Sequence, residues 1–492
     1  MQSKVLVVGA GPVGLTMAME LARYGVAVRI VEKAAQRTDK SKALVLWSRS
    51  LELLARAAPA DDFIDAGRKV VAAEIRTSEK LITKIDLTGV ESPYPYALML
   101  PQSETERLLE ARLAAFGVTV ERQVEWLRHS DDGGKITSVL RHVDGREESV
   151  ETGWLVGCDG AHSAIRHALN LPFDGDTLPA DFVLADAHLK GMPIPPSEIA
   201  VYWHRDGILA MFPITDGRYR IIADMGSSSG PHPVDPTLPE IQALVDRRGP
   251  PGLVLSDPIW LSAFRINERK VRDYQKGRVF VTGDAAHVHS PAGGQGMNTG
   301  MQDAFNLAWK LALVCRGTGK AEALLPSYSA ERSAVGDKVL KDAGRLTMIA
   351  TLRNHAAQTI RNTIGGMLFG LASVRRAMAD NMAEVTIGYP ESPLNGPSPG
   401  KPGGPAPGAR IPPIAGQSPI GAGGVPLFAL YAAPSEATKH LLRDFPDLLE
   451  QDARPPLHEG GIWLARPDGY VAAVAADEDI SALADYLAAL RA

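Results

Sequence analysis

The first 32 residues hold the pattern that most restricts how this chain can fold. The apolar run Lys4–Val8 predicts a strand, and Val26–Val31 predicts a second one. Between them lie Gly9-Ala-Gly-Pro-Val-Gly14 and a helical pattern over 12–24. Strand, glycine turn, helix and strand in this order form the βαβ unit that binds dinucleotides. We therefore expect an α/β fold that begins with a Rossmann-like unit; an ordinary βαβ turn is the alternative.

Each glycine of this turn has a separate task in a dinucleotide site. Gly9 makes the tight turn, Gly11 lets a pyrophosphate approach the backbone, and Gly14 lets the helix pack on the strand. Glu32 ends the second strand, at the distance from the glycines where an acid binds a ribose hydroxyl. An acid at this position favours a ribose with free hydroxyls over one that carries a 2′-phosphate.

The sequence from Val279 to Asn298, V-F-V-T-G-D-A-A-H-V-H-S-P-A-G-G-Q-G-M-N, is the second candidate ligand site. Val279–Thr282 predicts a short buried strand, and Asp284 then places a carboxylate at its end. A glycine-rich loop follows, and a helix is expected to start near Met297. Glycines let the backbone approach a flat ligand, and free N–H groups at a helix start favour negative charge. An ordinary glycine-rich turn is the alternative.

A third motif repeats this arrangement in the middle of the chain. Trp154-Leu-Val-Gly-Cys-Asp-Gly-Ala-His-Ser-Ala-Ile-Arg166 predicts a strand, a turn at Asp159 and a helix capped by Ser163. Two carboxylates, Asp159 and Asp284, therefore follow buried strands in addition to the glycine fingerprint. This arrangement is too coordinated to arise by chance.

The three motifs, in this order and at this spacing, resemble the class A flavoprotein aromatic hydroxylases, the para-hydroxybenzoate hydroxylase family. The likeness covers about residues 1–385. It implies one tightly held FAD, NADH or NADPH as reductant, and O2 as a further substrate. In this family reduced flavin and O2 form a hydroperoxide at the flavin C4a carbon, which delivers a hydroxyl group to an electron-rich aromatic ring. The cofactor carries the difficult chemistry.

The resemblance also implies roles for individual residues. An acid like Glu32 holds the ADP part, one like Asp284 meets the ribityl chain, and residues like Met297 and Asn298 lie against the pyrimidine edge of the flavin. The full set of expected cofactor-binding residues is Gly9, Gly11, Pro12, Gly14, Glu32, Lys33, Lys42, Gln102, Val124, Asp159, Arg220, Asp284, Pro291, Gly294, Gly296, Met297 and Asn298. The expected substrate-binding residues, on strands of a sheet above the flavin, are Val201, Phe212, Ile214 and Ile222. For these four, ordinary core positions are the alternative. No catalytic side chain and no metal site are predicted.

The expected fold class is α/β, with a Rossmann-like FAD-binding domain interleaved with a β-sheet substrate domain. The FAD-binding domain spans 1–175 and, with a helical segment, 271–389, while the substrate sheet spans 176–270. Residues 390–426 are rich in proline and glycine and predict an extended linker. Residues 427–492 resemble the small thioredoxin-like α/β module of the phenol-hydroxylase and polyketide-hydroxylase branch. They contain no cysteine, which excludes thiol redox chemistry there.

Composition narrows the class of protein further. The net charge of −5 offers no basic surface for nucleic acid, and no apolar run reaches the length of a membrane span. Two cysteines, Cys158 and Cys315, exclude a disulfide framework and fit a reducing cytoplasm. The first strand starts so early that no signal peptide is expected. The expected partners are a small aromatic substrate and O2, with the protein a monomer or homodimer.

The residues expected above the flavin suggest the kind of substrate. In the family, a substrate carboxylate is anchored by basic or hydroxyl groups on this sheet. Here the matching positions are apolar, and Arg220, the one cation among them, is expected to engage the flavin. Burying an unpaired carboxylate is unfavourable, so an uncharged, fairly large phenolic or polycyclic substrate is expected. Two alternatives remain: a flavin dehydrogenase or oxidase that inserts no oxygen, and a non-catalytic FAD-binding protein.

Overall fold

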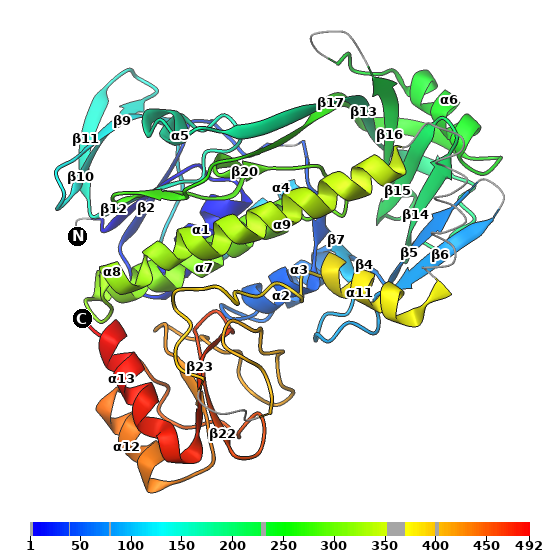
Figure 1. Cartoon of the computed structure of the whole chain (residues 1–492). Coiled ribbons are helices and arrows are strands. Elements are labelled where there is room, and N and C mark those ends of the chain that lie inside the picture. Colours follow the sequence, from blue (N-terminus) through cyan, green and yellow to red (C-terminus); the bar gives the residue numbers. More distant parts are fainter. Residues whose placement is uncertain (1–2, 39, 78–79, 228–232, 352–369, 399–402) are drawn as a thin grey trace.

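The computed structural model describes the chain except for residues 1–2, 39, 78–79, 228–232, 352–369 and 399–402 (Figure 1). Its first layer is a six-stranded sheet in the order β18-β19-β12-β1-β2-β8. All of its pairs are parallel except β18–β19. Apolar strands buried on both faces are typical of parallel sheets, and β1, β12 and β19 are buried throughout. The strands are β1 (Val5–Val8), β2 (Val28–Glu32), β8 (Glu121–Arg122), β12 (Trp154–Gly157), β18 (Gln275–Lys276) and β19 (Val279–Val281).

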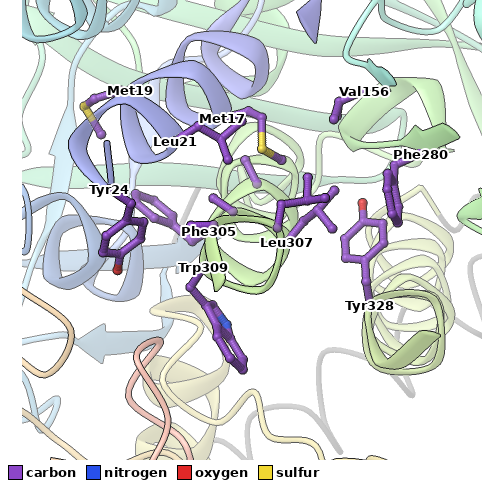
Figure 2. Close-up of a cluster of buried hydrophobic side chains, with 14 of the residues drawn as sticks. Met17, Met19, Leu21, Tyr24, Val156, Phe280, Phe305, Leu307, Trp309 and Tyr328 are labelled. Carbon is purple, nitrogen blue, oxygen red and sulfur yellow. The ribbon is translucent and has the colours of Figure 1, made fainter. Parts of the chain in front are cut away.

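Two long helices pack together beside this sheet. Helix α1 (Pro12–Arg23) begins directly after the glycine turn with proline in its first turn, where a missing N–H is tolerated. Helix α7 (Gly296–Arg316) follows the second glycine loop and ends at Gly317, which has a left-handed backbone. Figure 2 shows side chains of α1, α7, β12 and β19 meeting in one apolar core, with Tyr328 of α9 (Pro326–Ala350) at its side.

The second layer is an eight-stranded sheet in the order β20-β17-β13-β16-β15-β14-β5-β6. Strands β13 (Asp174–Lys190) and β17 (Val254–Lys270) are long enough to connect the two sheets as a two-stranded arm (Figure 1). Helix α6 (Leu238–Arg248) packs against one face, where Ile221, Ala223 and Val245 belong to a shared apolar core. The remaining strands are β5 (Ala72–Arg76), β6 (Leu81–Asp86), β14 (Glu198–His204), β15 (Gly207–Thr215), β16 (Arg218–Ser227) and β20 (His287–Val288).

Shorter elements connect these two layers. One small sheet has the order β3-β7-β4 and another the order β11-β10-β9. Their strands are β3 (Val45–Leu46), β4 (Arg68–Val70), β7 (Ala97–Met99), β9 (Val124–Asp131), β10 (Ile136–His142) and β11 (Glu147–Thr152). The remaining α-helices among the described residues before 390 are α2 (Ser48–Leu54), α3 (Asp61–Ala66), α4 (Gln102–Ala115), α5 (Ala164–Ala168), α8 (Ala321–Leu324) and α11 (Ala372–Met382).

The C-terminal residues form a three-stranded antiparallel sheet, β21-β22-β23, with two helices (Figure 1). Its elements are β21 (Ala429–Tyr431), α12 (Glu436–Asp444), β22 (Gly461–Ala465), β23 (Val471–Ala476) and α13 (Ile480–Leu490). The described residues of 390–426 contain no helix or longer strand, yet they follow β23 closely: Gly396 N–H donates to Ala472 O and Gly408 N–H to Val471 O, both at 2.8 Å. The thioredoxin-like character of 427–492 stays a prediction.

A cluster of four buried charges joins the C-terminal sheet to α7 and α9. We call it the Arg466 cluster; it contains Lys310, Glu331, Arg466 and Asp468. Arg466 donates to both oxygens of Glu331, at 2.6 and 3.0 Å, and to Asp468 at 2.6 Å. Lys310 Nζ donates to Glu331 at 2.8 Å. The side chains of Lys310, Glu331 and Arg466 have no exposed surface, so removing one partner would leave a bare charge in the protein interior.

Among the described residues, no helix combines the length and apolarity needed to cross a membrane.

Candidate functional site

A cavity of about 570 Å³ lies at the carboxyl ends of β1, β12 and β19, between the two main sheets. Open α/β sheets bind ligands at this edge, because the loops after their strands and the helix starts converge there. Fourteen of the predicted site residues line the cavity: Gly11, Pro12, Lys33, Lys42, Gln102, Asp159, Phe212, Arg220, Ile222, Asp284, Pro291, Gly294, Gly296 and Met297. The other seven, Gly9, Gly14, Glu32, Val124, Asn298, Val201 and Ile214, lie outside its lining.

The glycines of the first turn divide into two that pack and one that faces open space. Gly9 has φ +102°, and a Cβ there would lie 2.4 Å from the carbonyl oxygen of Cys158. A Cβ on Gly14 would lie 1.9 Å from Gly9 O, so helix α1 could not approach β1. A Cβ on Gly11 would meet no described atom within 4 Å. Gly11 thus borders room for a ligand at the start of α1, where N–H groups favour a phosphate.

Glu32 supports the turn from behind the cavity. Its carboxylate accepts hydrogen bonds from the backbone N–H groups of Ala10 and Ala34, each at 2.9 Å. The acid therefore fixes the chain between β1 and α1 and also ties the end of β2 to its own loop.

The two carboxylates at the strand ends differ in their bonding. Asp159 accepts from Ser163 Oγ at 2.6 Å and from Ala164 N–H at 2.7 Å, so it is bound to the start of α5. Ser163 caps this helix by accepting from Arg166 N–H at 2.9 Å, as predicted. Asp284 points into the cavity, and no described residue forms a hydrogen bond with its side chain. Surrounding protein raises the pKa of Asp284, while the positive charges of His287 and Lys42 act in the opposite direction.

A buried polar group that sequence reasoning missed holds the turn at Asp284. Asp303 of α7 accepts from Gly283 N–H at 3.0 Å and from His287 Nε2 at 2.8 Å. Its other oxygen accepts from Arg332 Nε at 2.6 Å. Burial by itself raises the pKa of Asp303, but the charges of Arg332 and His287 hold it below its usual value. The available signal was that Asp303 is the only acidic residue of the predicted helix from Met297 to Cys315.

Asn298 fixes the glycine loop and does not face the cavity. Its Oδ1 accepts from Trp47 N–H at 2.9 Å, and its Nδ2 donates to Val45 O at 2.8 Å. Trp47 Nε1 in turn donates to Gly293 O at 3.0 Å. These bonds join the start of α7 to β3, so the loop is held from both sides.

The positive charge of Arg220 is balanced by an ion pair with a carboxylate of the protein itself. Arg220 donates twice to Asp186, at 2.8 Å each, and to the carbonyl oxygens of Ser41 and Lys42. Through these bonds its guanidinium fixes the position of the segment that contains Lys42, which forms part of the cavity wall. The Gln102 amide acts nearby, because its Oε1 accepts from Ala43 N–H at 3.1 Å.

The four residues expected to bind substrate fall into two groups. Phe212 and Ile222 line the cavity. Val201 and Ile214 pack instead into an apolar cluster around Trp47 at its side, to which Phe212 also contributes. In register, Phe212 stands opposite Arg220 on the neighbouring strand. The face of the sheet next to the cavity is thus apolar at Phe212 and Ile222, with one neutralised cation between them.

His289 is a further cavity residue that sequence reasoning did not single out. Its Nδ1 lies 2.8 Å from Ser290 O, and its Nε2 is buried with no hydrogen-bond partner among the described residues. Burial and the charge of His287 lower the pKa of His289 to about 4. The imidazole is therefore neutral near pH 7.

Residues 2–343 match the family described as the FAD binding domain, and the chain belongs to this family. FAD is its cofactor, and the proteins it resembles are monooxygenases. One relative is 6-methylpretetramide 4-monooxygenase of Streptomyces rimosus, with 38% identity over 80% of this chain and 71% of its own length. Pentachlorophenol 4-monooxygenase of Sphingobium chlorophenolicum has 32% identity over 68% of this chain and 63% of its own.

A solved structure extends the likeness over the whole chain. The anhydrotetracycline hydroxylase of Streptomyces rimosus superposes with a TM-score of 0.81 and 27% identity, covering 100% of this chain and 99% of its own. The relatives are aromatic monooxygenases, which supports oxygen insertion over hydride transfer alone.

Proposed function

We propose that this protein is an FAD- and NAD(P)H-dependent monooxygenase that hydroxylates an uncharged phenolic or polycyclic aromatic substrate. The observation that carries the proposal is the two-sided character of the cavity. Its one side offers the open space at Gly11, the start of α7 and the unpaired carboxylate of Asp284. Its other side offers Phe212 and Ile222, with the nearby cation Arg220 already paired with Asp186.

These residues fit FAD in their chemical character. The N–H groups at the start of α1 suit the pyrophosphate, and Asp284 is an acceptor for ribityl hydroxyl groups. The start of α7 suits negative charge on the pyrimidine edge of the flavin. Bound FAD would accept hydride from NAD(P)H and activate O2. The remaining predicted contacts, including Glu32, Lys33, Lys42, Gln102 and Val124, are part of this proposal.

The apolar side selects the substrate. A carboxylate placed against Phe212 and Ile222 would lose water without gaining a partner. A neutral ring system gains roughly 25 cal/mol for each Å² that it buries there. The names of two relatives support a phenolic or polycyclic ring system, since one acts on pentachlorophenol and another on 6-methylpretetramide.

The experiment uses purified holoenzyme with isotope-labelled O2, NADPH or NADH, and a panel of neutral phenols, polycyclic hydroxyquinones and hydroxybenzoates. A neutral phenol or polycycle should stimulate NAD(P)H oxidation and yield a product with one labelled oxygen atom. Stimulated oxidation with no label in the product would instead support a dehydrogenase or oxidase. Efficient turnover of hydroxybenzoates with poor turnover of neutral polycycles would overturn the substrate assignment.

The remaining organisation is proposed on the sequence pattern. We propose FAD-binding segments 1–175 and 271–389, a substrate sheet 176–270, and a C-terminal thioredoxin-like module 427–492 after a proline- and glycine-rich segment. Both cysteines are free, which supports a protein of the reducing cytoplasm. A monomer or homodimer is the proposed state.

A further inference from the structure

A second cavity, of about 500 Å³, lies between α9 and the arm formed by β13 and β17. We call it the arm cavity. Its size is within the range of roughly 300–1,000 Å³ that small-molecule sites occupy. Its walls include Leu178, Ala180, Gly226, Glu268, Leu340 and Met348. Figure 1 shows α9 running along this arm toward the eight-stranded sheet.

The arm cavity is a direct neighbour of the cavity at Asp284. Ser290 lines the first cavity and Thr347 lines the second, and their buried hydroxyl groups are 2.6 Å apart. Strand β16 also passes from one to the other. Ile222 lines the first cavity, and Gly226, four residues farther along, lines the second. The two spaces are thus consecutive along one strand and share the wall at Ser290.

Glu268 gives the arm cavity a polar group that lacks a partner. Its Oε1 is buried and no described residue donates a hydrogen bond to it. Burial raises the pKa of this carboxyl. Its other oxygen, Oε2, lies against the backbone of Gly344, where an added Cβ would come within 3.0 Å of it. A buried acceptor of this kind is unfavourable unless a ligand donates to it.

The first cavity must hold the flavin dinucleotide itself, so the rings of a large substrate need space beyond it. We propose that the arm cavity is the distal part of the substrate site. It takes the far rings of an elongated polycyclic substrate, and Glu268 accepts a hydrogen bond from a ring hydroxyl. This inference rests on the proposed function and extends it. It selects elongated, hydroxylated polycycles over single-ring phenols.

The test compares two probes on FAD-loaded enzyme: 1-naphthol and a linear tetracyclic hydroxyquinone. Binding is followed by the change in flavin absorbance. Met348 lines the arm cavity with 68% of its surface exposed, so Met348→Trp should fill the space without disturbing the core. It should weaken binding of the tetracycle by about tenfold or more and leave naphthol within about twofold. The matched control is Leu346→Trp on the same helix, where a 40% exposed residue lies outside the lining. This control should change neither affinity.

Glu268→Met tests the polar contact separately. The wild type should prefer the hydroxylated tetracycle over its deoxy analogue by roughly fivefold, and the variant should lose this preference. A ratio of two affinities is insensitive to a general weakening of the fold. Equal tetracycle binding in wild type and Met348→Trp would overturn the proposal, as would no tetracycle binding to the wild type.

Failure of this inference can be told apart from failure of the proposed function. If naphthol is hydroxylated while Met348→Trp leaves the affinity for the tetracycle unchanged, the distal site is wrong and the monooxygenase assignment stands. If the tetracycle responds to Met348→Trp but no probe incorporates labelled oxygen, the distal site stands and the proposed reaction is wrong.

Discussion

The cavity at Asp284 and the Arg466 cluster lie at the two ends of helix α7, and their charges are paired in opposite ways. In the Arg466 cluster, Glu331 accepts hydrogen bonds from Arg466, Lys310, Asn306 and Ser392. In the cavity, Asp284 has no described hydrogen-bond partner and Gly11 borders open space. The comparison separates two uses of charged side chains, one buried and paired, the other exposed in the cavity. The paired charges of the Arg466 cluster stabilise the fold. The polar groups of the cavity still have hydrogen-bonding capacity for a ligand.

The largest expected effect comes from breaking the cluster. Arg466→Ala removes the ion-pair partner of the buried Asp468 and leaves the buried Glu331 with Lys310 as its remaining cationic partner among the described residues. This should lower the free energy of unfolding by about 3–5 kcal/mol. Deleting 427–492 removes both Arg466 and Asp468 and should prevent stable folding. Thermal and urea unfolding of the variants measure the loss.

The control for this prediction is Lys439→Ala, which removes an exposed ion pair with Glu436 in the same C-terminal region. Exposed pairs contribute roughly 0–1 kcal/mol, so the midpoint should barely move. If Arg466→Ala were as mild as Lys439→Ala, the buried cluster would not hold the C-terminal sheet.

A somewhat smaller effect is expected where the two regions meet. Asp303→Asn leaves Arg332 without its carboxylate and weakens the bonds to Gly283 and His287. We expect a loss of about 3 kcal/mol in unfolding free energy together with weaker FAD binding. Both quantities should fall, since Asp303 supports the turn that carries Asp284. An intact flavin affinity in a destabilised variant would show that the turn does not depend on Asp303.

The third prediction concerns the loss of folding stability at acidic pH. The pKa of His289 is lowered from 6.5 to about 4, so its neutral form is the one the fold favours. This contribution is fully present above pH 6.5 and is lost as the pH falls toward 4. The free energy of unfolding should therefore fall by about 2–3 kcal/mol between pH 6.5 and pH 4, because His289 becomes protonated more readily in the unfolded chain than in the folded protein. Replacement of His289 by Gln should flatten that part of the pH profile of unfolding, measured on apoprotein and on holoenzyme. An unchanged slope in the variant would assign the acid sensitivity to other groups.

The cavity at Asp284 and the Arg466 cluster also differ in how much of each could be predicted from the sequence. Gly9, Gly11 and Gly14 were predictable because the strand–turn–helix pattern that contains them is local, although the close contact at Gly9 is with the distant Cys158. Arg466 and Glu331 are 135 positions apart, and nothing in either local pattern indicates the other. The same holds for Ser290 and Thr347, which are 57 positions apart and each line one of the two neighbouring cavities.

Motif residues with their own protein partners were harder to interpret. Asn298 and Glu32 were expected to meet the cofactor, and they lie in the first turn of α7 and at the end of β2. Their side chains bind backbone groups of Val45, Ala10 and Ala34. Only the folded arrangement distinguishes a motif residue that faces the ligand from one that holds the loop in place. Their roles toward FAD stay predictions.

The most direct test measures the affinity of the Asp284→Ala apoprotein for FAD by calorimetric titration. Wild-type apoprotein is titrated in parallel. The variant removes an acceptor that has no described protein partner, so the unfolding free energy of the apoprotein should stay within about 0.5 kcal/mol of wild type. Flavin binding should weaken by about 1–3 kcal/mol, which is roughly a 5- to 150-fold rise in the dissociation constant. Undiminished FAD affinity in a stably folded Asp284→Ala protein would contradict the assignment of this cavity as the flavin site.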